Sequence, residues 1–266
     1  MLGLGFTLKS EAEKRYQILA KGTIEKGWMQ LTAQITHSTH KGHGPKLVLT
    51  AAIAVMFAAS VSMTAYAAEA PGLGAAAGFT VLGGAGVTCT NSNVAGEVGS
   101  LLTVTQTPSC SIAAIDAGDA AATAAFADFS VAYGIVAAMT CDPANNLTGQ
   151  ELGGMTLTPN VYCFNTTADL TSGTLTLDGP ADGIWIFQIG TGITTATTNV
   201  VMAGGGQPCN VFWETGTAAT IGEGTAFQGN ILAGSAITFT GASSSFVGRA
   251  LAKTAVTMTG ANISAC

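Results

Sequence analysis

The sequence predicts a mainly β protein, a parallel β-helix with one long α-helix packed alongside. Beyond Asn145 the chain consists of short runs of Thr, Val, Ile and Phe that are interrupted by glycine. These runs recur with a period near 19 residues, whereas residues 113–139 alone carry helical spacing. A repeat of this length with three short strands per period is typical of a β-solenoid.

The repeat is clearest near the end of the sequence. When residues 236–252 are placed over residues 255–264, Thr238 falls on Thr257 and Thr240 falls on Thr259. Residues 145–266 then make six or seven coils, which at about 4.8 Å per coil give a solenoid roughly 30 Å long.

The helix is expected over residues 113–139, which are rich in alanine and lack proline. Asp116 is the expected N-cap, and the segment ends at residues 141–143. About 24 helical residues would extend roughly 36 Å, which matches the predicted solenoid. One apolar stripe, expected to be buried, is formed by Phe126, Phe129, Tyr133, Val136 and Met139.

Composition excludes several classes of protein. With 48% hydrophobic and 9% charged residues and a net charge of −6, the chain is neither disordered nor a basic nucleic-acid binder. Beyond residue 66 there is no histidine, and Arg249 and Lys253 are the only basic residues against twelve acidic ones. We therefore expect no Ser-His-Asp or Cys-His catalysis, no metal site and no cofactor.

The N-terminal region resembles an export leader. Residues 47–63 are uncharged and apolar, Lys41 and Lys46 precede them, and Ala65-Tyr66-Ala67 follows. We interpret residues 1–46 as a leader or a mis-assigned extension, residues 47–67 as the signal-peptide core and cleavage site, and residues 68–266 as the mature domain. An uncleaved membrane anchor is the alternative, although 17 apolar residues are at the short limit for a span. Met29 is an alternative start.

The cysteines agree with export. All six follow the expected cleavage site and none forms a Cys-x-x-Cys pair, so an oxidising compartment and up to three disulfides are expected. Six cysteines allow fifteen pairings. Among these we favour the sequential one, which joins Cys89 to Cys110, Cys141 to Cys163, and Cys209 to Cys266.

Several ordered motifs resemble the microbial ice-binding protein family. They are LTPNVY (157–162), GTLTLDGPADGIWIFQIG (173–190), CNVFWETGTAATIGEGTAFQGNILA (209–233) and GRALAKTAVTMTG (248–260). The resemblance covers residues 72–264 and implies a discontinuous, right-handed solenoid of triangular cross-section with one helix alongside. It also implies that the early strands, within residues 78–88 and 94–105, pair out of sequence order to complete the solenoid. The six cysteines depart from many members of the family.

Threonine is the side chain expected to contact ice, because its β-branch fixes χ1 while its methyl and hydroxyl groups both face outward. Alternation along strands turns Leu175, Leu177, Phe239 and Met258 inward, and their threonine neighbours outward. The family's surface also includes adjacent loops with a Thr-Ala/Gly-x-Thr/Asn pattern, which residues 195–198, 217–220 and 259–262 match. The predicted ice-binding residues are Thr174, Thr176, Thr195, Thr197, Thr198, Thr220, Thr238, Thr240, Thr257, Thr259 and Asn262. We expect Thr238, Thr240, Thr257 and Thr259 to form two outward columns, which Thr194 could extend and residues 221–223 interrupt.

Two other functions were weighed. Parallel β-helices also host polysaccharide-cleaving enzymes, but the acid pairs Asp178 with Asp182 and Asp116 with Asp119 fit turns and a helix cap better than catalysis. A non-enzymatic adhesion or matrix module on the same fold is the stronger rival. We predict a secreted, monomeric protein whose partner is the ice surface, and which binds no nucleic acid and, after signal cleavage, no membrane.

Overall fold

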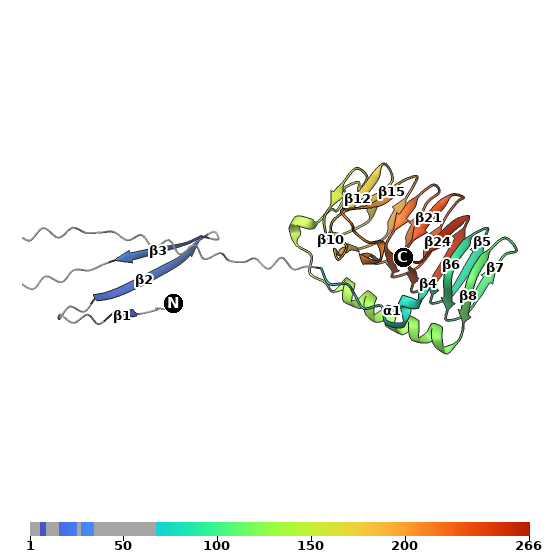
Figure 1. Ribbon diagram of the computed structural model, residues 1–266, viewed down its shortest axis with the longest axis horizontal. Helices are drawn as coiled ribbons and strands as arrows, with labels where there is room; N and C mark the ends of the chain where they lie inside the picture. Colours follow the sequence, from blue (N-terminus) through green and yellow to red (C-terminus); the bar gives the residue numbers. More distant parts are fainter. Residues whose placement is uncertain (1–5, 9–15, 26–27, 35–67) are drawn as a thin grey trace, which may run out of the picture. The chain divides into compact units, whose positions relative to one another are not determined.

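The computed structural model describes residues 6–8, 16–25, 28–34 and 68–266 (Figure 1). The chain divides into two units, residues 1–61 and 62–266. In the first, β1 (Phe6–Leu8), β2 (Tyr16–Glu25) and β3 (Trp28–Gln34) form an antiparallel sheet, in a segment for which no fold was predicted. The expected signal-peptide core and cleavage site, residues 47–67, lie outside the described residues.

The second unit is a parallel solenoid in which each complete coil contributes one strand to each of three faces (Figure 1). The helix-covered face comprises β10 (Asn160–Phe164), β13 (Trp185–Ile189), β16 (Val211–Thr215), β19 (Asn230–Ala233), β22 (Ala250–Ala252) and β4 (Phe79–Gly83). The threonine face comprises β11 (Ala168–Leu170), β14 (Ile193–Thr195), β17 (Ala219–Ile221), β20 (Ile237–Phe239), β23 (Ala255–Thr259), β5 (Gly86–Thr90) and β7 (Val104–Gln106).

The third face comprises β9 (Thr156–Leu157), β12 (Thr174–Asp178), β15 (Asn199–Ala203), β18 (Ala226–Gln228), β21 (Ser244–Val247), β24 (Ala261–Ser264), β6 (Asn93–Ser100) and β8 (Ser111–Ala117). β6 also links two faces, because its first residues pair with β24 and its last residues pair with β4 of the helix-covered face.

The stacking order of the coils differs from their order in the sequence. The coil of β4, β5 and β6 stacks on the coil of β22, β23 and β24, with parallel pairing on all three faces. This confirms the expectation that the early strands complete the solenoid out of sequence order. Because each coil hydrogen-bonds to the next, the docked coil covers the open edge that the last coil would otherwise expose.

The interior consists of inward-facing apolar side chains. Leu175, Leu177, Phe239 and Met258 are fully buried, as strand alternation predicts. Beneath the helix-covered face, inward aromatic rings stack from coil to coil, with ring centroids 5.5 Å apart for Tyr162 and Phe187 and 3.8 Å apart for Phe187 and Trp213. This stacked core fixes the register of the coils on which any outer surface depends.

The single α-helix of the described residues, α1 (Ala120–Ala137), is shorter than predicted. Residues 111–117 form β8 instead, so the predicted start at residue 113 and the predicted N-cap at Asp116 are wrong. The N-cap is Asp119, whose carboxylate accepts a hydrogen bond from the Ala122 amide at 2.8 Å. Tertiary pairing of β8 with β6 outweighs the helical propensity of this alanine-rich sequence.

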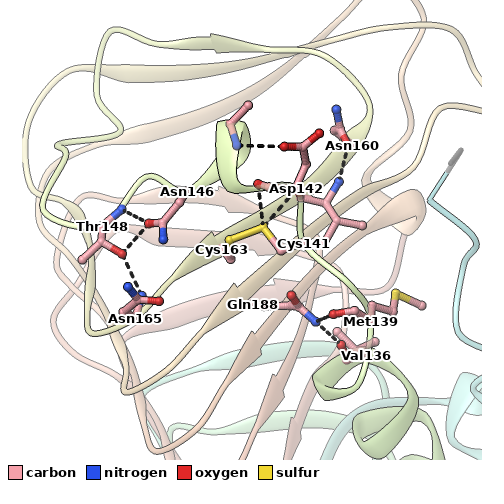
Figure 2. The surroundings of a disulfide bond; sticks show 12 residues. Val136, Met139, Cys141, Asp142, Asn146, Thr148, Asn160, Cys163, Asn165 and Gln188 are labelled. Atoms are coloured by element: carbon pink, nitrogen blue, oxygen red, sulfur yellow. Dashed lines mark hydrogen bonds between the residues drawn. A yellow bond between two sulfur atoms is a disulfide. The ribbon is translucent and has the colours of Figure 1, made fainter. Parts of the chain in front are cut away.

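The predicted apolar stripe does hold α1 against the solenoid. Phe129 and Val136 are fully buried, and Phe126, Tyr133 and Met139 pack against the same cluster. The Gln188 amide also donates hydrogen bonds to the carbonyl oxygens of Val136 and Met139, at 2.6 and 2.8 Å (Figure 2). The helix is long and apolar enough to suit a membrane span by composition, but here its stripe is part of the core.

A polar cluster anchors the middle of α1. The Tyr133 hydroxyl donates to the Thr215 carbonyl at 3.3 Å, and the Lys253 ammonium lies 3.5 Å from the centre of the Tyr133 ring. Burial and the neighbouring Glu214 raise the pKa of Tyr133, and burial raises the pKa of Glu214.

Three disulfides close the unit, and their connectivity is the sequential one. They join Cys89 to Cys110, Cys141 to Cys163, and Cys209 to Cys266. The second lies after α1, beside the short 3-10 helix η2 (Pro143–Asn145), and ties the helix end to β10 (Figure 2). Residues 68–266 also contain the 3-10 helices η1 (Gly74–Gly78) and η3 (Pro208–Asn210), and η3 carries Cys209.

Candidate functional site

The threonine face carries one continuous column of threonines. The central outward residue of each strand is in register with that of the next coil, so that the column runs through Thr194, Thr220, Thr238, Thr257, Thr88 and Thr105. Parallel pairing separates adjacent members by about 4.8 Å. The column crosses the break in chain order between β23 and β5, so it includes threonines that are far apart in the sequence.

A second, shorter column lies two residues further along each strand. Thr259 pairs with Thr90. Thr240 and Thr107 continue the column, because the residues before them, Phe239 and Gln106, pair with Met258 and Cys89. Their hydroxyls donate to the carbonyls of Ile221 and Cys89 in the neighbouring coils, at 3.4 and 3.3 Å. The threonine face is therefore two threonines wide over about half of its length.

The second column ends where smaller residues replace threonine. Ala196 and Gly222 take the equivalent positions in the coils of β14 and β17, since they follow the paired residues Thr195 and Ile221. This is the interruption that the sequence predicts at residues 221–223. On the opposite flank of the first column the side chains are small, as in the pair Ala255 and Gly86.

A rigid apolar layer supports the two columns. The residues flanking each threonine point inward and are buried, as Ile237 and Phe239 do around Thr238, and Val87 and Cys89 around Thr88. The disulfide of Cys89 fixes β5 from below. Asp169, which pairs with Thr194, is the one charged residue in register with the first column. The face is therefore uncharged along most of its length.

Five of the predicted residues lie where the sequence analysis placed them. Thr220, Thr238 and Thr257 share the first column, and Thr240 and Thr259 lie in the second. The strand alternation that turns Phe239 and Met258 inward is sufficient to explain the outward direction of their threonine neighbours.

The prediction is wrong for Thr195 and Thr198, which are 2% and 0% exposed. Both lie at the corner between the threonine face and the third face, where the tight bend leaves backbone groups that interior hydroxyls satisfy. Thr195 Oγ1 accepts from the Gly222 amide and contacts Thr225 Oγ1, each at 3.1 Å, and Thr198 Oγ1 donates to the Leu170 carbonyl at 3.3 Å. Thr197 occupies the corner itself, with a φ of 51°.

Three further predicted residues belong to a different surface. Thr174 and Thr176 lie on β12 and Asn262 lies on β24, so all three point outward from the third face. The structure therefore does not bring them together with Thr238. On the third face the equivalent column is mixed and consists of Thr174, Asn199, Ala226, Ser245, Asn262, Asn93 and Ser111.

Of the three segments that match the Thr-Ala/Gly-x-Thr/Asn pattern, one turns a corner in register with the neighbouring coil. Thr259-Gly260-Ala261-Asn262 turns the corner, with Thr259 on the threonine face and Asn262 on the third face. Residues 90–93 repeat this arrangement in the next coil, because Thr90 and Asn93 pair with Thr259 and Asn262. Residues 217–220 lead into β17 instead of turning a corner. Residues 195–198 do turn the corner, but Thr195 lies one residue before the position that corresponds to Thr259.

Four threonines of the two columns were not among the predicted residues: Thr88 and Thr90 of the docked N-terminal coil, and Thr105 and Thr107 of the coil that follows it. The alternation in residues 86–90, with Val87 and Cys89 inward, gives their outward direction. Their membership of the column depends on pairing with β23, for which the local sequence holds no signal.

Several acidic residues of the solenoid unit occupy structural positions. Asp119 caps α1, and Asp178 ends β12. Glu97 hydrogen-bonds to Asp116, and this contact is the main cause of the raised pKa of Glu97. No group of three His, Cys, Asp or Glu residues suited to a metal ion occurs among the residues that the structure describes.

A family model described as Ice-binding-like matches residues 70–264. The chain belongs to this family. An ice-binding protein of Nostoc sp. (strain HG1) is 40% identical over 194 residues, which cover 71% of each chain. An ice-binding protein of Flavobacterium frigoris (strain PS1) is 31% identical over 188 residues, which cover 64% of this chain and 68% of that one.

Solved structures of the ice-binding family confirm the predicted fold class. The crystal structure of an ice-binding protein from the Antarctic ascomycete Antarctomyces psychrotrophicus superposes with a TM-score of 0.69 at 30% identity, covering 74% of this chain and 98% of that chain. An ice-binding protein from an Antarctic biological consortium gives a TM-score of 0.71 at 30% identity, covering 74% and 92%.

Proposed function

We propose that this protein binds ice through the threonine face and thereby inhibits ice growth and recrystallisation. Family membership supports ice as the ligand. The observation that carries the choice of face is the column of six threonines, each from a different coil, on a sheet whose charged residue in register with the column is Asp169, at one end.

The chemistry of the column suits adsorption to a crystal of water. Each threonine offers a methyl group that water must surround and a hydroxyl that water must hydrogen-bond, and the β-branch holds both in one orientation. Neighbours repeat every 4.8 Å or so across the coils and every 6.6 Å or so along a strand. Because the buried layer beneath fixes these positions, little conformational entropy is lost on adsorption.

We further propose that the mature protein is secreted, monomeric and non-catalytic. The basic, apolar and Ala-x-Ala segments before residue 68 support export, and the three disulfides suit an oxidising compartment. The capping role of Asp119 supports the absence of a catalytic acid pair there.

The experiment is to measure ice recrystallisation inhibition and thermal hysteresis on residues 68–266, produced under oxidising conditions. Thr238→Tyr should abolish most of the activity, because a bulky ring in the middle of the column lifts the face away from ice. Thr174→Tyr is the matched control, a partly exposed strand threonine on the third face, and it should retain activity.

The two parts of the proposal fail in different ways. A folded and fully disulfide-bonded wild type without activity would contradict ice binding and favour the adhesion module. An active wild type with equal activity in Thr238→Tyr would leave ice binding intact and place the contact surface elsewhere.

A further inference from the structure

A cationic side chain lies against one of the three disulfides. Arg249 Nη1 lies 3.2 Å from Cys266 Sγ and 3.5 Å from Cys209 Sγ. The same nitrogen donates to Asn230 Oδ1 at 3.1 Å, and Arg249 Nε donates to the Ala77 carbonyl at 3.0 Å. The guanidinium thus bridges η1, β19 and the two sulfur atoms.

The charge of this guanidinium is poorly neutralised. Among the described residues its hydrogen bonds go to a carbonyl, an amide oxygen and sulfur, which are all neutral acceptors. Burial lowers the pKa of Arg249, but an arginine side chain keeps its proton in proteins. A half-buried cation of this kind stabilises negative charge that develops on an adjacent sulfur.

The other two disulfides have different surroundings. Cys141 Sγ lies near the carbonyl oxygens of Asp142 and Val161, at 3.5 and 3.7 Å, which present partial negative charge (Figure 2). Cys89 is fully buried. Lys253, the other basic residue of residues 68–266, lies over the Tyr133 ring and not beside a disulfide.

We propose that Cys209–Cys266 is a thiol-exchange site for low-molecular-weight thiols such as glutathione. The thiolate of the incoming molecule attacks Cys266 Sγ, because Cys266 is exposed and Cys209 is half-buried. A new S–S bond joins the thiol to Cys266, the old S–S bond breaks, and its electron pair leaves on Cys209 as a thiolate beside Arg249. A second thiolate then releases Cys266 as a thiolate and leaves as the oxidised disulfide of the small molecule.

The position of the site makes it separable from ice binding. Cys209 precedes β16 of the helix-covered face and Cys266 follows β24 of the third face, so the bond closes the corner opposite the threonine face. Exchange would release the end of β24, which pairs with β6 of the docked N-terminal coil. The inference does not rest on the proposed function.

The test is a time course of the fully oxidised protein with reduced glutathione under native conditions. Free thiols are quenched by alkylation, and peptides are mapped by mass spectrometry. We expect Cys209 and Cys266 to be modified roughly tenfold faster than the other four cysteines, because both thiolate stability and access favour them. Equal rates at the three disulfides would overturn the proposal, whether or not the protein binds ice.

Arg249→Gln tests the role of the cation, and Lys253→Gln is the matched control. We expect Arg249→Gln to slow the modification of Cys209 and Cys266 by about three- to tenfold, Arg249→Lys to keep most of the rate, and Lys253→Gln to leave it unchanged. If Arg249 only held the corner together, its replacement would loosen the corner and speed the reaction. An unchanged or faster modification of Cys209 and Cys266 in Arg249→Gln therefore overturns the proposal. If Arg249→Gln does not fold, two other measurements test the proposal: the relative modification rates of the three wild-type disulfides, and the modification rate of Cys209 and Cys266 in Arg249→Lys.

Discussion

The threonine face and the third face are built from the same backbone ladder but present different surfaces. Each displays one outward residue per coil in parallel register. The first column of the threonine face holds six threonines, whereas the equivalent column of the third face mixes Thr, Asn, Ala and Ser. Asparagine side chains rotate more freely about χ2 than a β-branched threonine does about χ1. A regular backbone is therefore not sufficient for a flat and rigid outer surface.

The strongest test of this comparison uses the docked N-terminal coil. Thr88 pairs with Thr257 on the threonine face, and Asn93, five residues later, pairs with Asn262 on the third face. We expect Thr88→Tyr to reduce ice recrystallisation inhibition several-fold, because the column crosses the break in chain order. Asn93→Tyr, its matched control, should change the activity little. Equal losses in both variants would mean that the two faces contact ice alike.

A second test separates Thr195 from its exposed neighbour Thr194. Thr195→Val keeps the shape of the side chain but leaves Thr225 Oγ1 without its partner, and removes a bond from the Gly222 amide. We expect the free energy of unfolding to fall by about 1–3 kcal/mol, while the activity of the folded protein is unchanged. Denaturant unfolding and recrystallisation assays at low temperature measure the two effects.

The control for this variant is Ser244→Ala at the same corner. Ser244 Oγ is buried and has no hydrogen-bond partner. Its removal should leave stability unchanged or raise it, by up to about 1 kcal/mol. A large loss in Ser244→Ala, or lost activity in a folded Thr195→Val, would contradict the division between interior and contact hydroxyls.

The smallest effect is expected from extending the second column. Ala196 is exposed and occupies the position that threonine occupies in later coils. Ala196→Thr should raise the activity modestly, about twofold or less, because it adds one hydroxyl and one methyl at a site compatible with strand geometry. Gly222 is unsuitable for the same extension, since a Cβ there would clash with the Thr195 carbonyl oxygen. Lower activity in a stable Ala196→Thr would show that the second column does not touch ice.

The local sequence pattern was sufficient to predict part of the candidate site. The alternation around Phe239 and Met258 correctly turns Thr238 and Thr257 outward, and the period near 19 residues correctly stacks them. The same reasoning fails at Thr195 and Thr198, because corners interrupt the strict alternation of a strand. It also groups Thr174 and Asn262 with Thr238, from which the structure separates them, since alternation distinguishes inside from outside but not one outer face from another.

The sequence by itself determined the class of fold, the inward and outward sides of most strands and the apolar stripe of the helix. These depend on periodicities and spacings that act over a few residues or one coil. The tertiary structure alone decided where the helix begins, which corner hydroxyls face inward, and that Thr88 and Thr105 complete the column begun by Thr194. These features depend on hydrogen bonds between strands far apart in the chain, whose pairing energy outweighs local propensity.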